Sequence, residues 1–202
     1  MSRLPSLNSI VTLFVIIIAL LTGCSGNKKG ETNRLREEFL DGCGDQSCWR
    51  GVRPGLTSGE NALEAVNGAG VTCDFSGDPQ QDSIWLCNWA PNDEDALYTW
   101  ASMNVTDDIV SQIWFDTRVV CPADFITAFG EPDLVSNGDS SYGLYYDNEL
   151  MLIVVDFTET VSSFGELYMF SEEFYIEHTT GLQASQTPWA DVKGILTEEC
   201  VE

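Results

Sequence analysis

The chain has 202 residues, with 32 aspartates and glutamates against 9 lysines and arginines, so its formal net charge is −23. A negative field of this size repels nucleic acid and anionic lipid headgroups, and the composition therefore argues against a nucleic-acid partner. A large excess of carboxylates is also typical of proteins that live in high salt, so the charge by itself assigns no function.

The N-terminal segment has the layout of an export signal. Arg3 is followed by an apolar run from Ile10 to Leu21 and then by Leu21-Thr22-Gly23-Cys24. This order of charge, short hydrophobic region and small residues is typical of a secretory signal. The apolar run is shorter than the roughly 20 residues that a transmembrane helix needs. Leu21-Thr22-Gly23-Cys24 resembles the lipobox of bacterial lipoproteins, which implies that residues 1–23 are a signal peptide and that Cys24 is acylated, with palmitate among the expected lipids.

Acylation at Cys24 would anchor an exported domain to a bilayer, because each buried methylene contributes roughly 0.8 kcal/mol. The polar stretch Ser25–Asn33 leads us to expect a lipidated N-terminus and flexible tether over residues 24–40. The resemblance implies attachment to the cell membrane or the outer membrane, facing the periplasm or the cell exterior. Ser25, in place of the aspartate that retains lipoproteins in the inner membrane, favours the outer membrane. The expected partners are membrane lipid and another envelope protein.

The remaining cysteines are even in number, as expected for disulfides in an oxidising compartment. They are Cys43, Cys48, Cys73, Cys87, Cys121 and Cys200. Many connectivities are open to six cysteines; we predict that nearest neighbours pair, as 43–48, 73–87 and 121–200. None has the Cys-x-x-Cys spacing of zinc or redox sites, and the single histidine, His178, is predicted at the exposed end of a strand. No metal and no cofactor is therefore expected.

Residues 41–202 are predicted to form one disulfide-linked globular domain. A capping box at Thr57 and Glu60 begins a helix at about 58–67, Pro122 begins a second helix that ends before Gly130, and a third runs from Trp189 toward Leu196. Segments of alternating aromatic and β-branched residues predict antiparallel strands. They are 71–75, 83–89, 97–105, 110–116, 142–146, 150–157 and 166–170. A helix followed by strands thus occurs twice. This order predicts an α+β fold, in which an antiparallel sheet has short helices packed on one face. It leaves open whether the two halves are a diverged repeat.

Short segments of the chain resemble known lipoproteins, and the order of its predicted elements resembles that of known inhibitors. Gly55-Leu56-Thr57 and Phe129-Gly130-Glu131-Pro132 resemble the start and end of the helical segment in outer-membrane-assembly lipoproteins of the BamE type. The tandem helix-plus-hairpin order is similar to that of the β-lactamase inhibitor proteins. The stretch from Cys48-Trp49 to Thr57 is similar to uncharacterised bacterial lipoproteins. These resemblances imply an architecture and carry over no functional residue.

No catalytic residues are predicted, because the chain lacks a Gly-x-Ser-x-Gly elbow and has no second histidine. Four tryptophans are candidate binding residues. Trp85 and Trp89 are predicted to share one face of a strand, and Trp100 and Trp114 to lie on neighbouring strands. They are either core residues or, where exposed, docking aromatics for a protein or glycan. The sequence therefore predicts a membrane-anchored, non-catalytic protein-binding or envelope-assembly module. Two alternatives remain open: an inhibitor or sequestering binder of a secreted hydrolase, and a glycan-acting enzyme that uses paired carboxylates.

Overall fold

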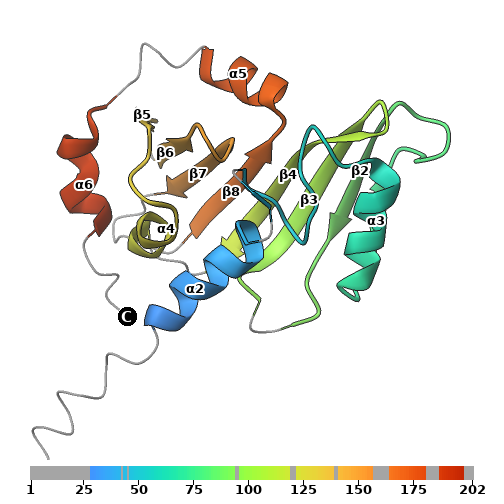
Figure 1. Ribbon diagram of the computed structural model, residues 1–202, viewed down its shortest axis with the longest axis horizontal. Coiled ribbons are helices and arrows are strands. Elements are labelled where there is room, and N and C mark those ends of the chain that lie inside the picture. The colour runs from blue at the N-terminus through green and yellow to red at the C-terminus, as the bar shows by residue number, and fades with distance from the viewer. Residues whose placement is uncertain are drawn as a thin grey trace, which may run out of the picture.

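The computed structural model describes residues 28–41, 43–44, 46–93, 96–118, 122–138, 141–156, 164–180 and 187–197. Its centre is an eight-stranded antiparallel sheet in the order β1-β2-β3-β4-β8-β7-β6-β5 (Figure 1). The strands are β1 Asp74–Ser76, β2 Ile84–Trp89, β3 Tyr98–Thr106, β4 Ile109–Arg118, β5 Leu134–Asn137, β6 Ser141–Tyr146, β7 Met151–Asp156 and β8 Phe164–Phe170. The helices are α2 Lys28–Phe39, α3 Gly59–Gly68, α4 Pro122–Phe129, α5 Glu172–Thr180 and α6 Trp189–Thr197. The predicted α+β class is confirmed.

The sheet consists of two halves with the same element order. In the first half α3 precedes the meander β1–β4, and in the second α4 precedes the meander β5–β8. The halves join where β4 pairs antiparallel with β8, placing Asp116 opposite Glu166. The predicted succession of helix and strands, twice over, is therefore the order that the structure has.

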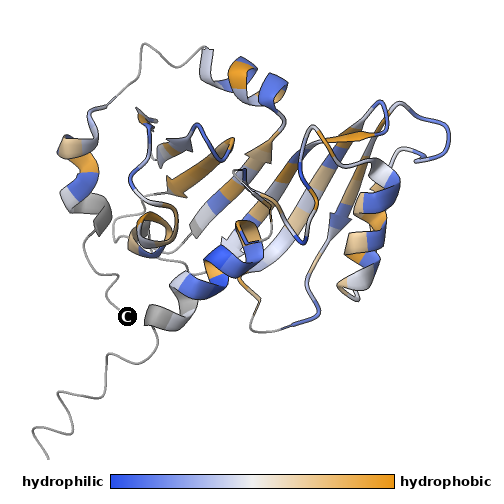
Figure 2. Cartoon of the chain, in the orientation of Figure 1, coloured by the Kyte–Doolittle hydropathy of each residue, from blue (hydrophilic) through white to orange (hydrophobic). Residues whose placement is uncertain are grey.

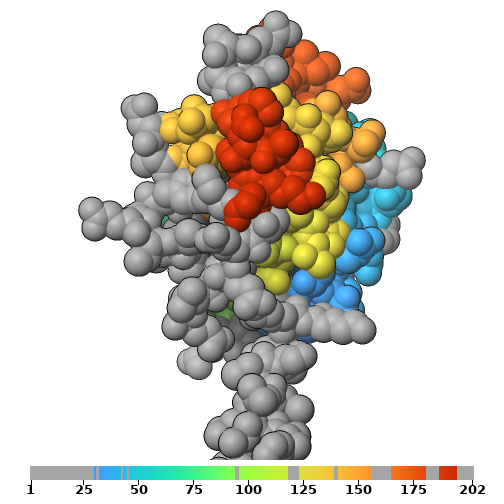
Figure 3. Space-filling model, turned by 90° about the vertical axis from the view of Figure 1, so that its left-hand side faces the viewer, coloured from blue at the N-terminus to red at the C-terminus, as the bar shows by residue number. Residues whose placement is uncertain are grey.

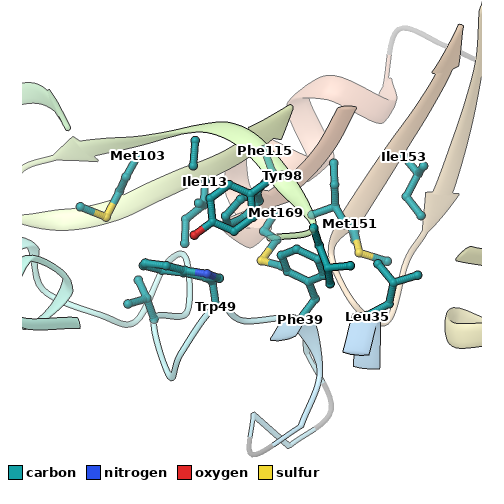
Figure 4. Close-up of a cluster of buried hydrophobic side chains, with 14 of the residues drawn as sticks. Leu35, Phe39, Trp49, Tyr98, Met103, Ile113, Phe115, Met151, Ile153 and Met169 are labelled. Atoms are coloured by element: carbon teal, nitrogen blue, oxygen red, sulfur yellow. The ribbon is translucent and has the colours of Figure 1, made fainter. Parts of the chain in front are cut away.

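The core lies between the sheet and the helices α2, α3, α4 and α6. Strand alternation turns one set of side chains inward, and apolar residues are concentrated along the strands (Figure 2). An aromatic cluster fills the centre (Figure 4), where the rings of Phe39 and Tyr98 each lie 5.0 Å from that of Phe115, and the rings of Trp49 and Trp89 lie 5.0 Å apart.

Helix α3 begins one residue later than the predicted capping box implies. Ser58 is the N-cap and accepts a hydrogen bond from the backbone of Asn61, whereas the hydroxyl of Thr57 accepts one from the backbone N–H of Arg53. Gly59 then lets the helix approach the sheet, because a Cβ at this position would lie 2.5 Å from the Trp85 ring.

The prediction of a flexible tether over residues 24–40 is wrong for Lys28–Phe39, which form α2. Leu35 and Phe39 of this helix are fully buried, and Arg36 donates a hydrogen bond to the carbonyl of Ala128 in α4 at 2.9 Å. Two apolar residues spaced by one helical turn are enough to anchor an otherwise polar helix. Residues 1–27, including Cys24 and the predicted signal peptide, lie outside the described residues.

Helix α5 also replaces a predicted strand end. His178 lies in this helix and is exposed, so the surface position is confirmed and the strand is wrong. Tyr175 of α5 packs against Tyr145, Leu152 and Phe170, which project from the face of the sheet opposite the main core. The edge strand β5 was not among the predicted strands.

Two of the predicted disulfides are present, Cys43–Cys48 and Cys73–Cys87, while Cys121 and Cys200 lie outside the described residues. The first disulfide loop is fixed to the β6–β7 turn, because the backbone and hydroxyl of Ser47 both donate to the carbonyl of Glu149. Helix α6 packs over α4 (Figure 3). Among the described residues, no helix has the length and hydrophobicity to cross a membrane.

Candidate docking face

The sheet has one face that the core helices do not cover, here called the open face. Helix α5 covers part of it, over β6, β7 and the end of β8. Strands β2, β3, β4 and β8 form the remainder. Their outward side chains include Leu86, Asn88, Trp100, Ser102, Asn104, Gln112, Trp114, Asp116, Glu166 and Tyr168. Because this set is fixed by strand register, its members keep constant spacing on a rigid support.

A shallow groove of about 200 Å³ runs across the centre of the open face. Its lining residues are Leu86, Ser102, Asn104, Gln112, Trp114 and Tyr168. Trp114 and Tyr168 are directly opposite each other on β4 and β8, with ring centroids 6.3 Å apart. The buried indole N–H of Trp114 has no hydrogen-bond partner among the described residues. The groove therefore combines aromatic surface with amide and hydroxyl groups, the mixture that recognition surfaces use.

A bulge in β3 brings Trp100 to this face. The register with β4 shifts between Tyr98 and Trp100, so Thr99 and Trp100 both point away from the core while Tyr98 and Ala101 are buried. Trp100 is 39% exposed, whereas Trp85 and Trp89 of the neighbouring strand β2 are 3% and 2% exposed. Bulges commonly redirect side chains beside functional sites, and this one places an indole ring opposite Asp116.

Two carboxylates lie beside the aromatic rings. Asp116 on β4 is directly opposite Glu166 on β8. Asp116 accepts a hydrogen bond from the hydroxyl of Thr99 at 2.7 Å, and Glu166 accepts one from the hydroxyl of Tyr168 at 2.6 Å. Both donors are neutral hydroxyl groups, and the cation nearest to Asp116 in the sequence is Arg118, two residues further along β4.

The aromatic surface continues beneath α5. The ring of Tyr168 stacks on Phe170 at 5.8 Å, and Phe170 lies 6.1 Å from Tyr175. Tyr175 donates a hydrogen bond to Asp147 at 2.7 Å. Burial and this neighbouring carboxylate raise the pKa of Tyr175, so the phenol remains a protonated donor that holds α5 in place. Helix α5 thus limits the open face on one side.

The predicted docking aromatics divide into two groups. Trp85 and Trp89 are 3% and 2% exposed and belong to the core, so they cannot contact a partner. Trp100 and Trp114 lie on the open face, and the structure brings them together with Tyr168, Asp116 and Glu166, none of which was predicted as a site residue from the sequence. The alternation of Glu166 and Tyr168 with the buried Leu167 and Met169 was a usable signal.

A larger cavity of about 590 Å³ lies on the other side of the sheet, next to α2. Two of its charged lining residues are paired with each other, since Glu38 accepts a hydrogen bond from the indole of Trp49 and lies 3.5 Å from Arg50. It also adjoins residues 94–95, which lie outside the described residues. Within the described ranges, no group of three or more histidine, cysteine or acidic side chains could hold a metal ion.

Comparison with protein-family models, with curated protein sequences and with solved structures gave no match.

Proposed function

We propose that this protein is a membrane-anchored, extracytoplasmic binding module that docks a partner protein on its open face. The observation that carries this proposal is the groove whose lining includes Trp114 and Tyr168, together with the exposed Trp100 on the neighbouring strand β3. Tryptophan and tyrosine dominate the binding energy of protein interfaces because they bury large areas while losing little side-chain entropy. A rigid antiparallel sheet holds these rings ready for contact.

The proposed anchor is Cys24, on the evidence of the segment Leu21-Thr22-Gly23-Cys24. Helix α2 begins at Lys28, only four residues later, and packs into the body. Four extended residues span at most about 14 Å. An acylated Cys24 would therefore hold the folded domain close to the bilayer, and a partner would be another protein at the same surface.

Site-directed photo-crosslinking in the cells that make the protein tests this proposal. A photoreactive amino acid at position 100 should give a recurrent crosslinked product with one partner, and the same amino acid at Asn67, exposed on α3, should not. Trp114→Ala should reduce the product from position 100. In the same cells, Cys24→Ser should move the protein out of the membrane fraction.

Equal crosslinking from positions 100 and 67 would contradict docking on the open face. Retention of the Cys24→Ser variant in the membrane fraction would contradict the anchor. The two parts of the proposal are therefore tested separately.

The tandem layout gives a second candidate, an inhibitor of a secreted hydrolase. It is favoured by the two helix-plus-four-strand halves joined at β4 and β8. Inhibition of purified secreted hydrolases by the soluble domain, lost on Trp100→Ala, would support this candidate.

A further inference from the structure

We propose that an amphipathic helix of the partner protein lies on the open face beside α5 and completes the helical layer that α5 begins. This inference rests on the proposed function and specifies which structural element of the partner makes the contact. It concerns the part of the open face that β2, β3 and β4 form, up to its border with β8.

Exposed apolar side chains are concentrated on this part of the open face. Of the six large hydrophobic side chains that are exposed within the described ranges, three lie here, namely Ile84, Trp100 and Ile109. Strand pairing places Ile84 and Ile109 in one row across β2, β3 and β4, on the face opposite the buried Trp85. Ile84 is 62% exposed. A group of exposed apolar residues on one surface is typical of an interaction site.

The next two cross-strand rows of β2, β3 and β4 hold no ionisable side chain. They consist of Leu86, Asn104 and Gln112, and of Asn88, Ser102 and Trp114. On a chain with a formal net charge of −23, a neutral area is the part of the surface that a partner can cover without burying a charge. Since burial of an unpaired charge is costly, an apolar partner element fits this area best.

The size of the neutral area favours a helix over an extended segment. Its three rows extend about 13 Å along the strands, and the strands from β2 to β4 span about 10 Å across, at 3.3 Å per residue and 4.8 Å per strand. A helix with its side chains is about 10–12 Å wide, whereas one extended segment covers little more than a single row. Strands β2, β3 and β4 each pair with a neighbour on both sides, so a strand of the partner cannot extend the sheet here.

Helix α5 shows how a helix packs on this face. Its Tyr175 packs against Tyr145, Leu152 and Phe170, so that α5 lies over β6, β7 and the end of β8. Tyr168 belongs to both regions, because it packs against this cluster and also lines the groove. Packed helices lie about 8–10 Å apart, which equals about two strand spacings. A helix beside α5 would therefore lie over β4 and the groove.

The polar side chains of the groove are compatible with such a helix. The amide of Asn104 donates a hydrogen bond to the side-chain oxygen of Gln112 at 3.1 Å, so the two amides partly satisfy each other within the face. The docking side of the partner helix is therefore expected to be uncharged, with apolar residues spaced three and four positions apart.

The test maps the crosslinks of the full chain in the cells that make it. A photoreactive amino acid is placed singly at positions 84, 100 and 102, and the crosslinked residues of the partner are identified by mass spectrometry. We expect these residues to fall in one segment of the partner, three or four positions apart. Crosslinks two positions apart would mean an extended segment. That result, crosslinks to a second copy of this chain, or crosslinks to a glycan would each overturn the inference.

A set of variants tests the neutral surface itself. Ile84→Asp should reduce the crosslinked product from position 100 about ten-fold or more, because it places a charge within the covered area. Ile84→Leu keeps an apolar side chain and should leave the product within about two-fold. The matched control is Asn67→Asp, which adds the same charge to the exposed side of α3 and should have no effect.

Equal losses of product from Ile84→Asp and Ile84→Leu, or from Ile84→Asp and Asn67→Asp, would overturn the inference. The side chain of Ile84 is exposed, so all three variants should keep a Tm within a few degrees of the parent protein. The spacing of the crosslinks is measured without these variants and is therefore independent of their stability.

The two proposals fail in different ways. If positions 84, 100 and 102 crosslink to one partner protein without the spacing of a helix, docking on the open face stands and the partner helix is overturned. If position 67 on α3 gives the same product as these positions, both are overturned.

Discussion

At the scale of single residues, Glu149 shows how the acidity of the chain affects its own stability. This residue lies in the β6–β7 turn, close to Asp133 and Asp147. Burial raises the pKa of Glu149, and the two neighbouring carboxylates raise it further. The folded protein therefore holds a proton on Glu149 more tightly than the unfolded chain does.

We predict that Glu149→Gln stabilises the protein near neutral pH. Because the pKa of Glu149 is raised on folding, its ionised form destabilises the folded protein at any pH above the folded-state pKa. This loss of stability fades as the pH falls through the folded-state pKa toward the ordinary pKa of glutamate, about 4.3. The Tm of the variant should exceed that of the parent at pH 7, and the difference should shrink by pH 4. Scanning calorimetry across this range measures it.

The matched control for this prediction is Glu173→Gln, an exposed acid on α5. Its effect on Tm should be small at both pH values. A decrease in Tm for Glu149→Gln at pH 7 would contradict the expected stabilisation and would mean that the carboxylate makes a favourable contact in the folded state.

At the scale of elements, α2 is the clearest test of how the domain is built. Leu35 is fully buried beneath the sheet, and Asn33, two residues earlier, is exposed. Leu35→Ala should reduce the free energy of unfolding by about 2–5 kcal/mol, whereas Asn33→Ala should change it by less than about 0.5 kcal/mol. Urea unfolding with the disulfides intact provides the comparison. Equal, small effects would mean that this segment behaves as a tether after all.

The elements that were predicted from the sequence are those with a clear pattern of apolar residues or clear helix-end residues. Segments rich in aromatic and β-branched residues identified β2, β3, β4, β6, β7 and β8, and the proline and glycine at its ends identified α4. Helix α2 was missed because its sequence is mostly polar, and only Leu35 and Phe39 carry its packing. Helix α5 was missed because its apolar residues are few and its buried contact, Tyr175, lies on the opposite face of the sheet.

The candidate site was predictable only in part. Strand alternation places Trp100 and Trp114 on strands, but whether a strand face is covered depends on where the helices pack. The juxtaposition of Asp116 and Glu166 depends on the pairing of β4 with β8, two strands about 50 residues apart in the chain. A contact of this range is fixed by the whole fold, and no local pattern in the sequence indicates it.

At the scale of the whole molecule, charge is distributed unevenly along the chain. Only Arg118 and Lys193 follow Arg53, whereas carboxylates continue to the C-terminus. The cations are therefore concentrated in α2 and the segment after it, close to the proposed anchor. If Cys24 is the membrane anchor proposed above, the strong negative charge of the rest of the body would repel an anionic bilayer and favour an orientation that directs it away from the membrane surface.

The same charge predicts that salt stabilises the folded protein. With a formal charge of −23 in a compact domain, self-repulsion opposes folding, and the screening length falls from about 30 Å at 0.01 M salt to about 3 Å at 1 M. We expect the Tm to rise by about 2–8 °C between these concentrations, which corresponds to a gain of roughly 1–2 kcal/mol for a domain of this size. Sodium and potassium chloride should act alike, because screening depends on ionic strength and not on the identity of the cation. A Tm that stays constant or falls with salt would mean that local contacts already compensate the negative charge. A difference between sodium and potassium would indicate a specific ion site in place of general screening.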